Sequence, residues 1–375
     1  MSKPENTTNT NTDTASRWAF VLLGLAFLFA MAWPLHPRTG WNVNTRLDLV
    51  FAVVEQGTVV IDDYHATPPY DTGDKAVYKG HYYSDKIFGV SLLAVPFYWL
   101  GTVLSGGAMD FQPAHYLMKT GAVALPGALA AAFFWLLLTR LGTPPKRAVL
   151  LTFFAVAGTM WLGFGTVFYP YMPGLAALMG ALLVTFYPPA QRLNLLNCLA
   201  VGALLGFALL CDLTFGLAVF GVGVIWLLRL LDQAGVIGLR AFASMKGERS
   251  RVRETARFAT AFWAGVLLPL AIFFVYSYSI FGELTIPYRY EADPLFREGM
   301  AKGFMGVEAP SPAVLWFITV HPFRGFFFWS LVAVMALAGC IIGTLQAGKR
   351  MLVSWLGIGT LAAYLLFNSG YYMWW

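Results

Sequence analysis

Nine runs of apolar residues, each long enough to cross about 30 Å of hydrocarbon, restrict the fold of this chain more than any other feature. Hydrophobic residues make up 58% of the sequence and charged residues only 12%. Soluble domains carry roughly 25% charged residues, so this chain has too little polar surface to fold in water. We therefore expect an all-α polytopic membrane protein, not a cytosolic enzyme or a nucleic-acid-binding protein. The nine runs are 18–35, 115–139, 148–168, 171–187, 194–211, 213–230, 258–281, 325–345 and 351–367.

A further apolar run, 87–104, is ambiguous because it contains Pro96 and two glycines. If it does not cross, one side of the membrane carries 15 of the 25 Lys and Arg residues and 5 of the 19 Asp and Glu residues. The positive-inside rule places that side in the cytosol. We expect 87–104 to be a re-entrant or interface-lying helix, in a protein of a bacterial inner or plasma membrane. Residues 1–16 then form a disordered cytosolic tail, and 17–375 form the transmembrane domain.

Two outer segments, 36–113 and 282–324, are too long to be simple connections. In the first, apolar side chains recur at helical spacing over 46–55, which predicts an amphipathic helix on the outer surface. Asn44 or Thr45 would cap its start. Together with the interfacial helix, the first outer loop is expected to carry two surface helices.

Charged and aromatic residues are densest at 71–86 in this loop. One interpretation is a solvated loop with surface ion pairs. The other is a binding site, since Tyr83 and Lys86 directly precede the interfacial helix, where a phenol and a cation would meet a lipid phosphate.

A carboxylate beside that phosphate would act as a general base on an incoming hydroxyl. Turns at Gly73 and Gly80 would fold the loop back and bring Asp74 to Lys86. We rank the candidates for the base in the order Asp74, Asp62 and Asp48.

The second outer segment offers Arg324 as another phosphate ligand, with an ordinary interfacial anchor as the alternative. Arg289 is a weaker candidate of the same kind. Tyr171 lies on a turn of the same face, where a structural role is the simpler interpretation. The sequence contains no Walker loop, zinc spacing, catalytic triad or dinucleotide fingerprint.

Several short motifs accompany this layout: Asn44-Thr-Arg46, Glu55-Gln-Gly57, Ile61-Asp62-Asp-Tyr64, Gly73-Asp74-Lys-Ala, Gly80-His-Tyr-Tyr83-Ser-Asp-Lys86 and Pro322-Phe-Arg324. In motifs and layout the chain resembles the GT-C superfamily of membrane glycosyltransferases, and within it the protein O-mannosyltransferase and lipid A aminoarabinose transferase branch. The resemblance covers most of the chain in layout, but its specific residues lie within 73–96.

The resemblance implies sugar transfer from a polyprenyl-phosphate-linked donor to a lipid, glycan or protein acceptor on the outer face. It implies that an acid of the first outer loop is the base and that Tyr83 and Lys86, with Arg324, hold the donor phosphate. Substrate contacts would come from Asn44, Arg46, His81, Tyr171 and Arg289. It leaves room for a divalent cation, Mg²⁺ or Mn²⁺, although no metal ligands are assigned.

The chain departs from the family where an acid usually opens the first surface helix, since Asn42 and Asn44 stand there. Family members also continue beyond the position of Trp375, so a C-terminal truncation is an alternative. The rival function is a non-enzymatic lipid or solute transporter or flippase, which would be expected to show inverted repeats and broken helices at the midplane.

Overall fold

The computed structural model describes residues 8–34, 36, 39–186, 193–237 and 252–375, and these are mostly helical. Four helical segments are long and apolar enough to cross a membrane: Phe111–Arg140, Leu213–Gln233, Val252–Phe281 and Lys349–Gly370. Five shorter apolar helices accompany them: Val21–Ala32, Gly89–Ser105, Tyr171–Phe186, Leu195–Cys211 and Leu331–Thr344. The chain is therefore a mostly helical protein with several helices of membrane-spanning character.

The first half of the chain forms α1 (Thr8–Ala32), α2 (Trp41–Phe51), the π-helix η1 (Ala52–Gln56), β1 (Ala76–Tyr78), β2 (His81–Tyr83), α3 (Gly89–Ser105), α4 (Phe111–Lys119), the π-helix η2 (Thr120–Ala124), α5 (Leu125–Arg140), α6 (Pro145–Ala157), α7 (Met160–Gly165) and α8 (Tyr171–Phe186). The second half forms α9 (Leu195–Cys211), the 3₁₀ helix η3 (Leu213–Phe215), α10 (Gly216–Gln233), α11 (Val252–Phe281), the 3₁₀ helix η4 (Pro287–Tyr290), α12 (Pro294–Met300), α13 (Pro312–Thr319), α14 (Phe326–Trp329), α15 (Leu331–Thr344) and α16 (Lys349–Gly370).

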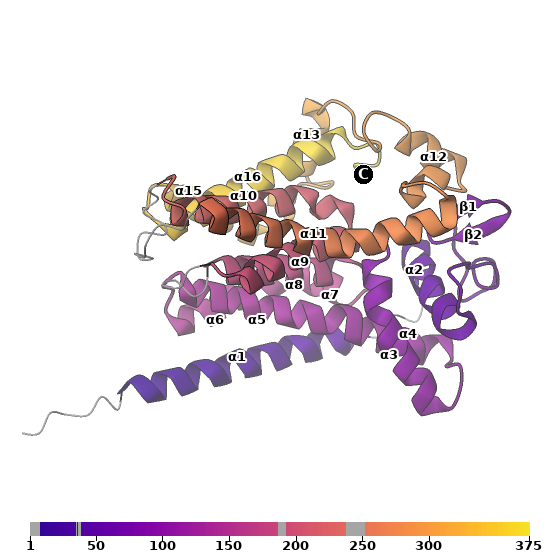
Figure 1. The fold of residues 1–375 in the computed structure, drawn as a ribbon, viewed down its shortest axis with the longest axis horizontal. Helices are drawn as coiled ribbons and strands as arrows, with labels where there is room; N and C mark the ends of the chain where they lie inside the picture. The colour runs from indigo at the N-terminus through magenta and orange to yellow at the C-terminus, as the bar shows by residue number, and fades with distance from the viewer. Residues whose placement is uncertain (1–7, 35, 37–38, 187–192, 238–251) are drawn as a thin grey trace, which may run out of the picture.

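The long helices run side by side as a bundle, from α1 at one edge through α5, α8 and α9 to α11 and α16 (Figure 1). Glycines let α9 and α11 approach closely, as small residues do between membrane helices. A Cβ atom on Gly202 would lie 2.0 Å from the Phe262 carbonyl oxygen, and one on Gly206 would lie 2.4 Å from the Val266 carbonyl oxygen. Larger side chains at these two positions would separate the helices.

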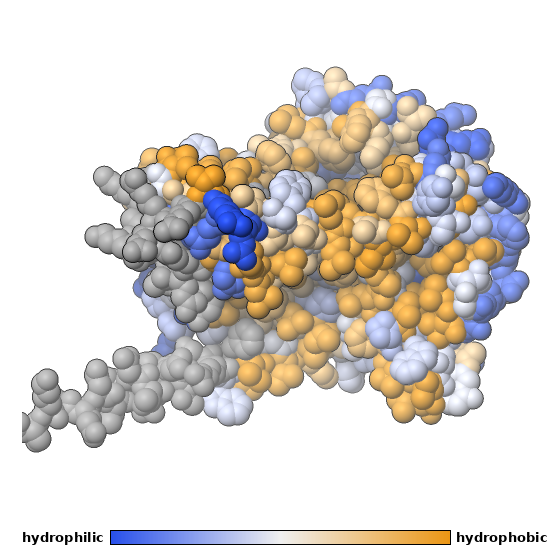
Figure 2. Space-filling view, in the orientation of Figure 1, coloured by the Kyte–Doolittle hydropathy of each residue, from blue (hydrophilic) through white to orange (hydrophobic). Residues whose placement is uncertain are grey.

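The surface of the bundle separates apolar from polar residues. Apolar residues cover its flank, whereas hydrophilic residues gather at the end that carries the β-hairpin and α12 (Figure 2). Such an apolar flank is the surface expected of helices that face lipid.

Two predicted spans are not continuous helices. The run 148–168 is divided into α6 and α7 at Gly158, and 325–345 is divided into α14 and α15 at Ser330. The hydropathy of a run does not reveal such a break, because Gly158 and Ser330 change the backbone direction without adding charge. Residues 8–16 of the predicted tail belong to α1, and residues 1–7 lie outside the described part.

The first outer loop folds against the polar end of the bundle, but α2 is not the surface helix that the sequence predicts. Every residue from Val43 to Phe51 is buried. The helix begins at Trp41, so Asn44 and Thr45 lie inside it and do not cap it. The Asn44 side-chain amide donates to the carbonyl oxygens of Pro69 (3.1 Å) and Asp71 (2.8 Å), which holds the following loop over the polar face of α2. This cover makes the apparent amphipathic surface helix a core helix.

Two glycines lie where local elements end. Gly57, with φ +66°, ends η1 in the left-handed conformation. Lys79 and Gly80, both with positive φ, form the tight turn that joins β1 to β2. The antiparallel hairpin pairs Ala76 with Tyr83 at its open end. The segment that precedes Ala76 therefore lies close to the segment that follows Tyr83.

Candidate functional site

A polar cavity of about 690 Å³ lies between the first outer loop, the second outer segment and the C-terminal part of the chain. Its polar lining residues come from six separate places in the sequence. They are Asn42, Arg46, Lys86, Tyr169, Tyr171, Asp212, Thr214, Tyr288, Asn368 and Tyr371. Concave sites with a few convergent polar groups are where proteins bind small ligands.

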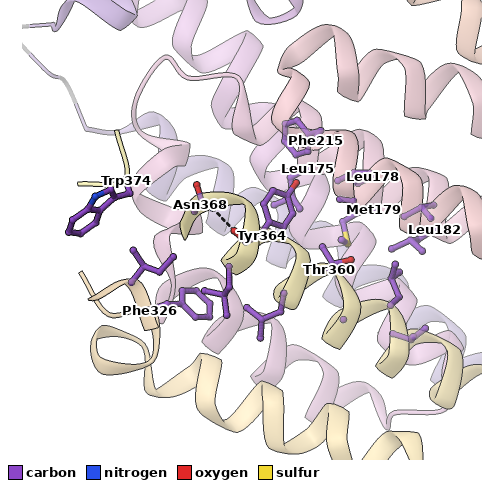
Figure 3. A pocket seen from close by; sticks show the side chains of 18 of the residues that line it. Leu175, Leu178, Met179, Leu182, Phe215, Phe326, Thr360, Tyr364, Asn368 and Trp374 are labelled. Carbon is purple, nitrogen blue, oxygen red and sulfur yellow. Dashed lines mark hydrogen bonds between the residues drawn. The ribbon is translucent and has the colours of Figure 1, made fainter. Parts of the chain in front are cut away.

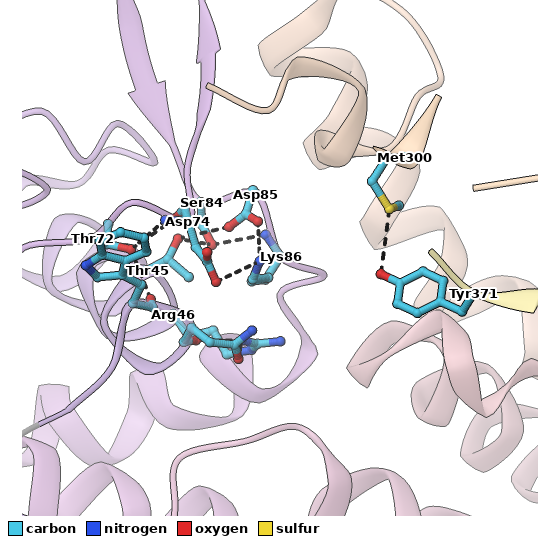
Figure 4. A network of polar contacts seen from close by, with 11 residues as sticks. Thr45, Arg46, Thr72, Asp74, Ser84, Asp85, Lys86, Met300 and Tyr371 are labelled. Carbon is cyan, nitrogen blue, oxygen red and sulfur yellow. Dashed lines mark hydrogen bonds and ion pairs between the residues drawn. The ribbon is translucent and has the colours of Figure 1, made fainter. Parts of the chain in front are cut away.

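The hairpin brings Asp74 and Lys86 together, as the two turns predict. The Lys86 ammonium lies 3.0 Å from Asp74 Oδ2 and also forms an ion pair with Asp85 (Figure 4). Burial of the ammonium lowers its pKa, but the Asp85 and Asp74 carboxylates outweigh that effect and hold the pKa above the usual lysine value. Lys86 is therefore a charged residue whose charge is already compensated by two carboxylates.

Backbone and hydroxyl contacts fix this ion cluster from both sides. The Thr45 hydroxyl donates to Ser84 Oγ at 3.1 Å, and the Asp74 amide donates to Thr72 Oγ1 at 3.1 Å. Thr72 in turn donates to the Trp41 carbonyl oxygen at 3.0 Å. The start of α2 thus holds both ends of the hairpin in place.

Two residues of the second outer segment complete the cluster, and the sequence did not single out either of them. The ring of Tyr288 lies 5.5 Å from the Lys86 ammonium. Glu291 pairs with Ala76 on the edge of β1 and is buried beside Asp85. Burial, followed by the nearby Asp85 carboxylate, raises the pKa of Glu291 to about 9, so this acid is protonated at neutral pH. In this region the sequence pointed only to their neighbour Arg289 as a phosphate ligand. The Arg289 guanidinium pairs at the surface with the Glu283 carboxylate at 3.4 Å.

Arg46 lies on the wall of the cavity and has neutral partners. Its Nη1 donates to the Asn42 carbonyl oxygen at 2.6 Å and to the Asn42 side-chain oxygen. The side chain is buried, and its Nε has no hydrogen-bond partner in the described part of the chain. Arg46 and Lys86 face Tyr371 and Met300 across the cavity (Figure 4).

The other two acids proposed as the base lie away from this cavity. Asp48 is completely buried within α2, and neither carboxylate oxygen has a hydrogen-bond partner among the described residues. Burial, then the Asp71 charge, raises its pKa to about 9. Asp62 is exposed, 2.8 Å from His81 Nδ1, and accepts from the Tyr82 amide at 2.7 Å. Asp62 and His81 therefore stabilise the exposed side of the hairpin through their contact with each other and the contact of Asp62 with the Tyr82 amide.

The remaining sequence-predicted residues are divided among several places. Tyr171 lines the polar cavity together with Arg46. Tyr83 is buried against Phe281 outside it, with ring centroids 6.1 Å apart. Asn44 holds the loop over α2, and Arg324 lines a different, apolar cavity.

That second cavity, of about 780 Å³, is lined mostly by apolar side chains of α8 and α16 (Figure 3). Leu175, Leu178 and Met179 face Thr360 and Tyr364 across it. Asn368 lines both this apolar cavity and the polar cavity. The two cavities therefore adjoin at Asn368, one with charged walls and one with hydrocarbon walls.

The described residues do not provide an evident site for Mg²⁺ or Mn²⁺. No group of three or more His, Cys, Asp or Glu side chains in the part of the chain that the structure describes is placed to hold a metal ion. Asp74 and Asp85, the nearest pair of carboxylates, already neutralise Lys86. These residues therefore do not fit a divalent cation.

No protein-family model matches the chain, and no curated protein or solved structure matches it. Its function is therefore inferred from the chemistry of the two cavities and the residues that line them.

Proposed function

We propose that this chain is a GT-C-type membrane glycosyltransferase that transfers a sugar from a polyprenyl-phosphate-linked donor to an acceptor. One observation carries the proposal: a polar cavity that presents Arg46 and Lys86 adjoins an apolar cavity at Asn368. A lipid phosphate needs this combination, with the Arg46 guanidinium for the phosphate and hydrocarbon walls for the chain. The aromatic rings of the polar cavity offer flat apolar faces on which a sugar ring would pack.

In the proposed reaction an acceptor hydroxyl attacks the anomeric carbon of the donor sugar. The bond between that carbon and the phosphate oxygen breaks, and a carboxylate accepts the hydroxyl proton. The leaving polyprenyl phosphate gains negative charge in the transition state, which the Arg46 guanidinium would stabilise. A lipid, glycan or protein would each supply a suitable hydroxyl.

Two carboxylates compete for the role of the base. Asp74 is favoured by the sequence and touches Lys86, which lines the cavity. Asp212 is the acid among the described lining residues, and its Oδ1 accepts from the Thr214 amide (2.9 Å) and hydroxyl (2.8 Å). Those contacts hold the Asp212 carboxylate in one orientation. Asp48 is a poor base because it is buried and protonated at neutral pH.

The test is turnover of a panel of polyprenyl-phosphate-linked hexoses and pentoses by the purified chain in lipid nanodiscs. Membrane extract supplies acceptors, and release of polyprenyl phosphate is measured. We expect the residue that acts as base to lose about 10²–10⁴-fold in turnover as its Asn variant while donor binding is retained. Asp62→Asn and Asp48→Asn serve as controls with the same chemical change.

If Asp74→Asn and Asp212→Asn both keep wild-type turnover, the mechanism is contradicted. A wild-type chain that moves the lipid across a vesicle bilayer without consuming it would favour the transporter or flippase instead.

We further propose a bacterial inner or plasma membrane location, with the N-terminus in the cytosol and the polar cavity on the outer face. The asymmetry of Lys and Arg supports this orientation. In a cysteine-free background, an impermeant thiol reagent added to intact cells should label His81→Cys but not Lys146→Cys. The reverse labelling pattern would overturn the orientation.

A further inference from the structure

The cavity contains a buried arginine without an anionic partner. Arg46 is 3% exposed, and its hydrogen bonds within the described residues go to Asn42, a neutral amide. No described carboxylate lies within ion-pair distance of its guanidinium, and its Nε is unpartnered. A buried cation without a counter-charge is strongly unfavourable, so the missing anion is expected to come from a ligand.

Lys86, the other cation of the cavity, is in the opposite situation. Its ammonium is shared between Asp74 at 3.0 Å and Asp85, so this group of three side chains carries a net negative charge. Glu291 beside them is protonated at neutral pH and adds no charge. Lys86 therefore has little positive charge left to offer a phosphate.

The remaining ionisable groups around Arg46 do not add positive charge. Asp212, another lining residue of the cavity, is acidic. The phenols of Tyr171, Tyr288 and Tyr371 also line the cavity and are neutral. Among the described lining residues, Arg46 is thus the one uncompensated cation, and it can balance one negative charge on a ligand. A second negative charge would be repelled by Asp212 and by the carboxylates of Asp74 and Asp85.

We infer that Arg46 is the anion anchor of this cavity, and that the site selects a phosphodiester with one negative charge over a phosphomonoester with two. The inference rests on the proposed function in taking the ligand to be an isoprenoid phosphate. Arg46 presents a planar fork that matches two phosphate oxygens, which suits this role better than a lysine ammonium does.

This selectivity has a consequence for the reaction cycle. The sugar-linked donor is a phosphodiester and carries one charge, whereas the polyprenyl phosphate left after transfer is a monoester. A phosphomonoester loses its second proton near pH 6, so the product carries close to two charges at neutral pH. Repulsion by the surrounding carboxylates then favours release of the product over retention, and this discrimination needs no movement of the protein.

The experiment measures the affinity of the wild-type chain in nanodiscs for three probes: a polyprenyl phosphate, its methyl phosphodiester and the corresponding diphosphate. At pH 8 we expect the methyl diester to bind about ten-fold or more tightly than the monoester, and the diphosphate to bind most weakly. Between pH 5 and pH 8 the affinity of the diester should stay constant while that of the monoester falls.

The role of Arg46 is tested with Arg46→Gln and Arg46→Lys. The Gln variant should lose about ten-fold to over a hundred-fold in diester affinity, and the Lys variant should recover part of it. Arg297→Gln is the matched control, since that arginine of α12 is exposed and lines neither cavity. Thermal unfolding checks that each variant is folded.

Equal or tighter binding of the monoester at pH 8, or wild-type affinity in folded Arg46→Gln, would overturn the inference and leave the proposed function standing. Failure of the wild type to bind any of the three lipids would overturn both. Because the probe comparison needs only the wild-type chain, it decides the question even if the Arg46 variants do not fold.

Discussion

Two clusters pair carboxylates with a basic side chain of the first outer loop, but they differ in their surroundings. The buried network consists of Asp74, Asp85, Lys86 and Glu291, and the Asp85 side chain within it is 1% exposed. The surface pair consists of Asp62 and His81, whose side chains are 37% and 56% exposed. Charges in water interact weakly, whereas charges withdrawn from water depend on their partners for stability. The same residue types therefore have a structural role in one cluster and a minor role in the other.

The largest expected effect is the loss of the cation from the buried network. Lys86→Met would leave Asp74 and Asp85 buried without a counter-charge, which is expected to destabilise the fold by about 3–5 kcal/mol. Thermal unfolding of the purified chain measures this as a lower midpoint or as lost yield. Lys86→Arg keeps the charge and should be milder. An unchanged midpoint in Lys86→Met would mean that the network is not coupled to folding.

Asp74→Asn should have a smaller effect, because Asp85 remains beside Lys86. Loss of one charge-assisted contact is expected to lower stability by about 1.5–3 kcal/mol. Asp63→Asn is the matched control in the same loop, since Asp63 is exposed and accepts from Gln56 at 2.9 Å. Equal losses in the two variants would remove the distinction between buried and exposed acids.

Glu291 makes stability depend on pH. Its pKa is about 9 in the folded chain and 4.5 as an ordinary side chain, so the folded state retains a proton that the unfolded state releases. The contribution of the protonated acid is fully present below about pH 4.5 and is lost as the pH rises toward about 9. Glu291→Gln mimics the protonated acid and cannot ionise. Its free energy of unfolding should therefore fall less steeply with pH than that of the wild type, by up to about 1.4 kcal/mol per pH unit.

Unfolding midpoints of the wild type and Glu291→Gln across this pH window measure the difference. Asp48→Asn provides a second comparison, because burial raises the pKa of Asp48 in the same direction. Parallel pH profiles for the wild type and Glu291→Gln would show that Glu291 is already ionised in the fold.

The smallest effect is expected at the surface pair. His81→Ala removes an exposed contact with Asp62, which should change stability by less than about 1 kcal/mol. Asp62 keeps its contact with the Tyr82 amide in this variant, so the hairpin should persist. Unfolding in low and high salt checks the point, and a loss as large as that of Lys86→Met would contradict the comparison.

Local spacing in the sequence was sufficient for part of the site. Gly57 ends a helical segment and Gly80 reverses the chain, and each needs a backbone conformation that glycine adopts without strain. From turns at Gly73 and Gly80 the meeting of Asp74 with Lys86 could be predicted, and the structure confirms that the two side chains meet. The apolar runs likewise determined the helical, membrane-spanning character of the chain.

Tertiary packing decided what local spacing does not encode. The pattern of α2 predicts a surface helix, but loop contacts through Asn44 bury it, and Arg46 Nε is left buried without a hydrogen-bond partner among the described residues. Tyr288 and Glu291 reach Lys86 from about two hundred residues further along the chain. Asn368 joins the two cavities from still further away. Turns depend on the conformations of adjacent residues, whereas a buried site depends on which distant segments exclude water from the same space.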